Sequence, residues 1–156
     1  MRGNDAVIEA LNDVLTAELT AINQYYVHYK MCENWGYQKL ASKKKSESFE
    51  EMKHADMVIE RILFLEGVPN MQRLSPVQVG ENPIEQHKLD LQLETDAATR
   101  LNGSIALARE SADNVTREML EDILKNEEES VDWLEAQLYI VEQIGSENYL
   151  AEQIHD

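Results

Sequence analysis

Residues 5–33 read DAVIEALNDVLTAELTAINQYYVHYKMCE and contain neither glycine nor proline. Along this stretch, one set of side chains recurs every three or four residues, as one face of an α-helix requires. That set is Ile8, Leu11, Leu15, Glu18, Ile22, Tyr25 and Tyr29. The stretch therefore predicts one long helix, which Asn34-Trp35-Gly36 ends.

Three further segments have the same period. The second runs to about Leu65, and the third begins after Pro83. The fourth begins near Asp113, a residue type that is preferred as an N-cap, and ends at Gly145. Residues 146–152 fit one short fifth helix, and no segment has a comparable strand pattern. We therefore expect an all-α four-helix bundle that forms a single domain over residues 1–156.

The connections predict the topology. Short turns join the first helix to the second and the third to the fourth, so each pair forms an antiparallel hairpin. The connection between the second and third helices, residues 66–82, is longer. Some 16 extended residues reach about 50 Å, whereas a helix of roughly 28 residues is about 42 Å long. This linker can cross the whole bundle. Its apolar residues favour a packed crossover; they are Val68, Met71, Leu74, Val77 and Val79.

The composition excludes several classes of protein. Thirty acidic residues against 14 Lys and Arg give a net charge of −16, which disfavours nucleic-acid binding. No apolar run is long enough to span a membrane, and no secretory signal is evident. Cys32 is the only cysteine, which suits the cytoplasm. We expect the lysines at 43–45 and His28 at the surface, and His87 hydrogen-bonded in the core or a channel.

Each of the four apolar faces carries a carboxylate near its middle. These residues are Glu18, Glu51, Glu94 and Glu127, and both hairpins separate their pair by 33 positions. A single such residue would most simply lie at the edge of the face or pair with an arginine, but the faces contain no Lys or Arg. His54 follows Glu51 by one turn, on the same side of its helix. Converging carboxylates with an imidazole suit a pair of iron or manganese ions.

The chain also resembles the ferritin superfamily and, within it, the bacterioferritins. The resemblance covers essentially the whole sequence. It is carried by LTAINQY at 19–25, EMKHAD at 51–56, ERILFLEG at 60–67, DWLE at 132–135 and ENYL at 147–150. It implies a hollow shell of 24 subunits that oxidises Fe(II), a ferroxidase activity, and stores the product as a ferric mineral.

The resemblance also assigns ligands by position. Glu18 and Glu94 would be the terminal ligands, Glu51 and Glu127 would bridge the two irons, and His54 would complete the first iron. Ser130 stands where the family pattern has a second histidine. A hydroxyl is a much poorer iron ligand than imidazole, so we expect a weakened second site, which water or a chelating Glu94 would have to complete.

Met52 is predicted to face out of the bundle, because it lies one residue, or about 100°, beyond Glu51. The same outer face carries Phe49, Ile59 and Leu63. By itself this apolar patch predicts a hydrophobic dimer seam. The resemblance adds that Met52 and its two-fold mate would ligate one haem b between two subunits.

Three functions therefore stay open. The first is an iron-oxidising storage protein with a modified di-iron site. The second is a haem-bearing, weakly active subunit that co-assembles with a second, competent bacterioferritin chain. The third is a di-iron oxidoreductase, such as a peroxidase, on the same bundle. A small ferredoxin-type protein is a candidate reductant for stored iron.

Overall fold

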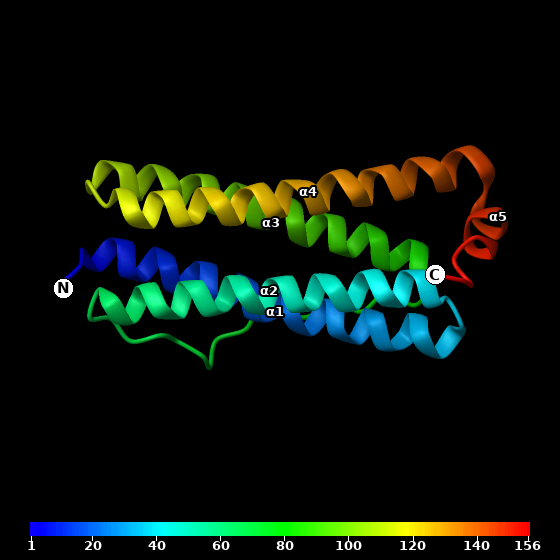
Figure 1. Ribbon diagram of the computed structural model, residues 1–156, viewed down its shortest axis with the longest axis horizontal. Helices are drawn as coiled ribbons and strands as arrows, with labels where there is room; N and C mark the ends of the chain where they lie inside the picture. The colour runs from blue at the N-terminus through cyan, green and yellow to red at the C-terminus, as the bar shows by residue number, and fades with distance from the viewer.

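The computed structural model describes all 156 residues and is built from helices, with no strand. The four long helices are α1 (Asp5–Trp35), α2 (Gln38–Phe64), α3 (Pro83–Glu110) and α4 (Asn114–Ile144), and the short α5 is Ser146–Ala151. Figure 1 shows α1 beside α2 and α3 beside α4, with α5 across one end. The predicted four-helix bundle with a short fifth helix is confirmed.

Side-chain caps begin three of the four long helices. Asn4 accepts hydrogen bonds from the first turn of α1, Asn82 does so for α3, where Pro83 follows it, and Asp113 caps α4. Gly36 ends α1 in the left-handed region, with a φ of 89°, which glycine adopts without strain. The chain therefore reverses within two residues before α2.

A series of polar side chains on α1 holds the crossover between α2 and α3. They recur every fourth residue, so they line one side of the helix: Asn12, Thr16, Thr20, Gln24 and His28. At one end Asn12 Oδ1 accepts from the Asn70 amide at 2.8 Å, and at the other His28 Nε2 accepts from the Gly80 amide at 3.0 Å. The extended crossover thus follows α1 from Asn12 to His28 (Figure 1).

The prediction that apolar side chains pack the crossover against the bundle was wrong. Its apolar side chains mostly point to solvent: Val68 is 81% exposed, and Met71, Leu74 and Val79 are also exposed. Backbone amides of the crossover, and the Arg73 side chain, instead donate hydrogen bonds to the polar series on α1 and hold the segment in place. His28, expected at the surface, is fully buried because it belongs to this series.

Two apolar clusters form the core. The larger lies where α1 and α2 pack near the N-terminus, around Leu11, Leu15 and Ile62. The smaller lies at the α5 end, around Leu40 and Tyr149. Polar residues fill the interior between them, and these build the site described next.

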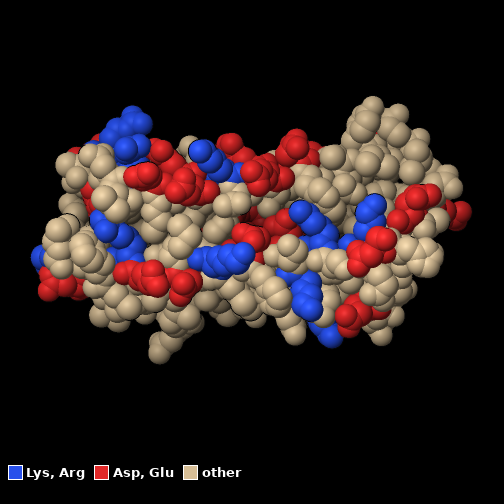
Figure 2. All heavy atoms as spheres, in the orientation of Figure 1, with Lys and Arg blue, Asp and Glu red and all other residues tan.

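The surface mixes charge signs. Figure 2 shows acidic and basic side chains interspersed over the visible face, whereas the end where α4 meets α5 has a patch with neither. Tyr139, Ile140 and Ile144 are exposed there. None of the helices has the length and apolar character that crossing a membrane requires.

Candidate metal centre

Each long helix brings one carboxylate to the middle of the bundle. Glu18, Glu51, Glu94 and Glu127 are all at most 2% exposed, although carboxylates seldom lie so deep. His54 joins them from α2 at 3% exposure. We call these five residues the metal centre.

Four of the five surround one point. Ligand atoms of Glu18, Glu51, His54 and Glu127 all lie within 4.8 Å of one another. His54 Nδ1 lies 3.1 Å from Glu127 Oε1 and 3.6 Å from both Glu18 Oε2 and Glu51 Oε2. The structure thus brings together the four residues that the sequence analysis assigned to the first iron.

Glu94 stands slightly apart from this group. Its Oε1 accepts a hydrogen bond of 2.7 Å from the Tyr25 hydroxyl, and its Oε2 has no partner. Tyr25 is therefore more than a packing residue, because it orients the carboxylate predicted to bind the second iron.

Several buried polar atoms of the metal centre make no hydrogen bond. They are Glu18 Oε2, Glu94 Oε2, Glu127 Oε1 and both ring nitrogens of His54. Leaving buried polar groups unpaired is costly, and no Lys or Arg is paired with these carboxylates. Oxygen donors with one imidazole fit a hard or borderline cation such as iron or manganese. The residues present therefore fit a bound metal.

The electrostatics support this conclusion. Burial raises the pKa of all four carboxyls, and the charges of neighbouring carboxylates raise the pKa of Glu51, Glu94 and Glu127 further. Burial lowers the pKa of His54, but its contacts with Glu127, Glu18 and Glu51 outweigh burial and raise it to about 12. Without a metal, the centre therefore retains protons, and a binding cation must displace them.

Ser130 is buried beside the centre at the seam between α2 and α4. Its hydroxyl donates a hydrogen bond of 2.9 Å to Glu47 Oε2. Sequence reasoning did not select Glu47, although it lies one turn before Glu51 and shares that face of α2. The signal was present in the spacing 47, 51 and 54.

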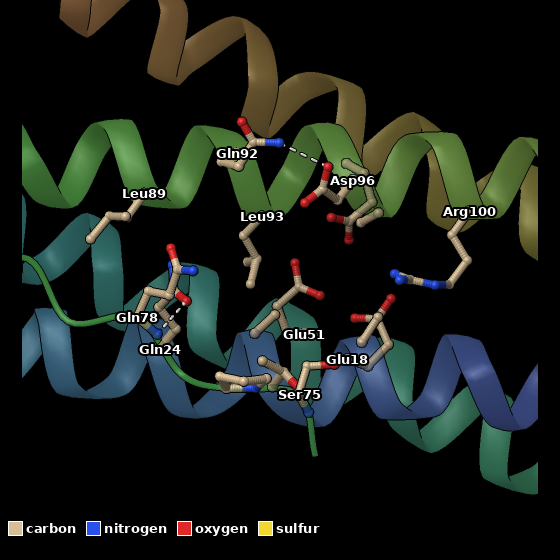
Figure 3. Close-up of a pocket in the computed structure, with 16 residues that line it drawn as sticks. Glu18, Gln24, Glu51, Ser75, Gln78, Leu89, Gln92, Leu93, Asp96 and Arg100 are labelled. Carbon is tan, nitrogen blue, oxygen red and sulfur yellow. Dashed lines mark hydrogen bonds between the residues drawn. The ribbon is translucent and has the colours of Figure 1, made fainter. Parts of the chain in front are cut away.

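Two cavities lead to the metal centre. One, of about 220 Å³, lies between α1, α3 and the crossover and is lined by Glu18, Glu51 and Glu127. Figure 3 shows Arg100 and Asp96 of α3 above these carboxylates, with the Arg100 side chain extended toward Glu18. The second, of about 290 Å³, lies in the seam between α2 and α4.

A second buried polar cluster lies up to two helical turns before Glu51 on α2 and before Glu94 on α3. We call it the Lys44 network; it comprises Gln24, His28, Lys44, His87, Asp90 and Tyr149. Lys44 Nζ lies 2.5 Å from Asp90 Oδ2, and both residues are fully buried. The prediction that Lys44 belongs to a solvated face was wrong, because Asp90 on α3 provides its counter-charge.

Hydrogen bonds fix the histidine tautomers in this network. His28 Nε2 accepts from the Gly80 amide, so Nδ1 carries the proton and donates to Asp90 Oδ1 at 2.9 Å. His87 Nδ1 accepts from Lys44 at 3.0 Å, so Nε2 donates to the Tyr149 hydroxyl at 2.9 Å. His87 is thus the hydrogen-bonded core histidine that the sequence predicted.

Met52 lies outside both clusters. It is 43% exposed on the outer face of α2, near the exposed Phe49 and Leu63. The predicted outward direction of Met52, Phe49 and Leu63 is therefore confirmed, whereas Ile59, predicted on the same outer face, is partly buried and packs against the larger apolar cluster.

Comparison with known proteins identifies the family. The ferritin-like domain family matches residues 8–155. The chain is 45% identical to the bacterioferritin of Mycobacterium leprae over 152 residues, which cover 97% of this chain and 96% of that one. It is 44% identical to the bacterioferritins of Brucella melitensis, covering 96% and 92% of the two chains, and Streptomyces coelicolor, covering 97% and 90%. The chain therefore belongs to the ferritin-like proteins and, within them, to the bacterioferritins.

Proposed function

We propose that this protein stores iron and oxidises Fe(II) at the metal centre before depositing it as ferric mineral. Membership of the bacterioferritins supports iron storage as its role. The observation that carries the ferroxidase assignment is the group of buried, unpaired donor atoms contributed by all four helices. A structural polar cluster would have paired these atoms within the protein.

The ligand roles are those that the resemblance to the bacterioferritins implies. Glu18 and His54 would bind the first iron, Glu94 would bind the second, and Glu51 and Glu127 would be shared between them. The proximity of His54 to Glu18, Glu51 and Glu127 supports the first site. Each Fe(II) loses one electron, and one oxidant takes both; dioxygen would take two protons with them and leave as hydrogen peroxide.

The surrounding residues prepare this chemistry. The four carboxylates offset the charge of the two substrate cations in a largely water-free interior, where electrostatic attraction is strong. Tyr25 holds one oxygen of Glu94 and leaves the other free. The cavity between α1, α3 and the crossover provides a route from the surface to Glu18.

A closed shell of 24 subunits is the proposed assembly. The exposed apolar side chains support burial against other copies: they occur around Met52, on the crossover and where α4 meets α5. Two facing copies of Met52 would offer two thioethers to one haem b. A ferredoxin-type protein stays the predicted reductant, and the cytoplasm stays the predicted location.

Replacing Met52 by Leu tests the haem assignment. Leu keeps the apolar surface but removes the sulfur, so Met52→Leu should lose haem uptake while the shell still forms. Absorption spectra after haem reconstitution measure uptake, and light scattering measures assembly. Normal haem binding by the variant would show that Met52 is not the ligand.

Ser130 favours a second candidate function. With a hydroxyl in place of the second histidine, the chain would be a haem-bearing subunit of weak ferroxidase activity that co-assembles with a competent bacterioferritin chain. Both functions use the same fold and first iron site. They differ in how rapidly the pure homopolymer oxidises iron.

Stopped-flow oxidation at two Fe(II) per subunit separates the two functions. We expect slow or incomplete oxidation by the native protein, and an initial rate about tenfold higher in Ser130→His, because an added imidazole strengthens the second site. Glu128→Gln is the matched control, since Glu128 is exposed on the same helix. Rapid oxidation by the native protein, unchanged in Ser130→His, would exclude the weak-subunit function.

A further inference from the structure

Glu47 is a buried carboxylate to which the proposed function assigns no role. It is 9% exposed and lies one helical turn before Glu51. Its Oε2 accepts from Ser130 at 2.9 Å, and its Oε1 lies 3.0 Å from Lys43 Nζ. Glu47 thus bonds to Ser130, which stands at the position where the resemblance predicts a histidine ligand.

An open space connects Glu47 to the metal centre. The seam cavity is lined only by polar residues, among them Glu47, Ser130, Glu51 and His54. His54 is almost completely buried, and both of its ring nitrogens lack a partner. Glu47 thus shares this cavity with Glu51, one of the two proposed bridging ligands, and with His54.

The present partners of Glu47 are easily exchanged. Lys43 is 35% exposed, so its ammonium group can return to water. Ser130 contributes one neutral hydroxyl. Asp90 is held differently, because it receives bonds from a fully buried lysine, from Gln24 and from His28. Glu47 is therefore positioned by weak contacts, whereas Asp90 is fixed.

We propose that Glu47 completes the second metal site, so that a carboxylate replaces the missing imidazole. Ser130 is then a positioning residue that holds Glu47 beside the site until a metal binds. This inference rests on the proposed function. It gives the second site only oxygen donors, from Glu47, Glu51, Glu94 and Glu127, whereas the first site keeps one nitrogen. Oxygen donors suit Mn(II) and iron better than Zn(II).

Anaerobic calorimetric titration of the metal-free protein with Mn(II), alongside electron paramagnetic resonance, tests the assignment. We expect two unequal sites in the native protein. Glu47→Gln should weaken one of them by at least about tenfold, a loss typical of impaired metal sites, and leave the other unchanged. Glu50→Gln is the matched control, since Glu50 lines the same cavity but is paired with Lys53, whereas Ser130 bonds to Glu47; it should change neither affinity more than about twofold.

A double variant separates ligation from a structural effect. If Glu47 is a ligand, Ser130→His should restore the weakened site in the Glu47→Gln background, because imidazole occupies the vacant position. Unchanged binding in Glu47→Gln, an equal loss in Glu50→Gln, or no rescue by Ser130→His would each overturn the proposal. If the native protein bound no Mn(II) or Fe(II), the proposed function itself would fail.

A crystal structure of the native protein soaked with Mn(II) gives a test that does not depend on the folding of a variant. A Glu47 oxygen about 2.2 Å from the second metal would support the assignment. A Glu47 carboxylate still bonded to Ser130, with both metals bound, would overturn it.

Discussion

The metal centre and the Lys44 network lie two turns apart in the same bundle, and both are buried to a similar degree. The metal centre collects four carboxylates around one imidazole and leaves five polar atoms without a partner. The Lys44 network places one carboxylate among a lysine, two histidines and an amide, and every polar atom in it is bonded.

The two clusters shift acid pKa values in opposite directions. Burial raises the pKa of every carboxyl in the metal centre, and like charges add to it. Burial also acts to raise the pKa of Asp90, but Lys44 and the hydrogen bond from His28 outweigh it and hold that pKa far below its usual range. Burial alone therefore does not determine the direction of a carboxyl's pKa shift; the charges that surround the carboxyl determine it.

This difference indicates two roles. A cluster that completes its own bonds stabilises the fold and has no need of a ligand. A cluster that leaves donors unpaired is stable only when something else binds. Three measurements on the metal-free protein test this distinction.

The largest effect is expected for Lys44→Met. Removal of the ammonium leaves Asp90 buried beside neutral groups, and breaking a buried ion pair in this way costs about 3–5 kcal/mol. Urea unfolding monitored by circular dichroism measures the change. Lys45→Met is the control, because Lys45 is exposed on the next position, and it should stay within about 0.5 kcal/mol of the native protein. A decrease of less than about 1 kcal/mol in the free energy of unfolding of Lys44→Met would show that the Lys44 network does not stabilise the fold.

Glu94→Gln is expected to have the opposite sign. The amide removes a buried carboxyl that Glu51 and Glu127 repel and leaves the His54 contacts in place, so the metal-free protein should gain about 1 kcal/mol of stability, as substitutions at strained functional sites often do. The same variant should lose most of the stabilisation that Mn(II) gives the native protein. Unfolding with and without the metal provides both values, with Glu128→Gln as the control. A clear destabilisation without metal would mean that the metal centre is structurally complete by itself.

The smallest effect is the pH dependence. Carboxyls with raised pKa values, and His54 likewise, bind more protons when folded, so their contribution to stability is present at low pH and is lost as pH rises through the folded pKa values. Asp90 acts in reverse: its contribution is present above the usual carboxyl pKa and is lost only in strong acid.

The metal-free protein should therefore become less stable between pH 5 and pH 8. A loss of 1 kcal/mol lowers the melting temperature by about 2–4 °C for a chain of this size, which calorimetry resolves. Saturating Mn(II) should reverse the trend, because protons no longer compete for the ligands as pH rises. A melting temperature that rises with pH in the absence of metal would contradict the raised pKa values.

Much of the fold and of the metal centre was accessible from the sequence, because both depend on regular spacing. Helical periodicity located all four helices, and the same periodicity placed Glu18, Glu51, Glu94 and Glu127 on inward faces. Local spacing also paired Glu51 with His54. These inferences need only the geometry of a single helix.

What the sequence did not reveal depends on partners distant along the chain. Lys44 was expected in solvent because two lysines flank it, and only Asp90, 46 positions later, explains its burial. His28 was likewise misplaced, since its partners are Asp90 and the backbone of Gly80. The role of Glu47 depends on Ser130 of α4, which lies 83 positions away.

The division of the bundle into two hairpins has a consequence for the order of folding. Most helix contacts lie within the α1–α2 and α3–α4 pairs, and such local contacts form quickly. Each hairpin carries only part of the proposed ligand set: Glu18, Glu51 and His54 lie in one, and Glu94 and Glu127 in the other. If these residues bind two irons as proposed, neither hairpin could hold the pair before the hairpins dock. Iron would then bind only chains that have completed this last step, and bound iron would slow their reopening.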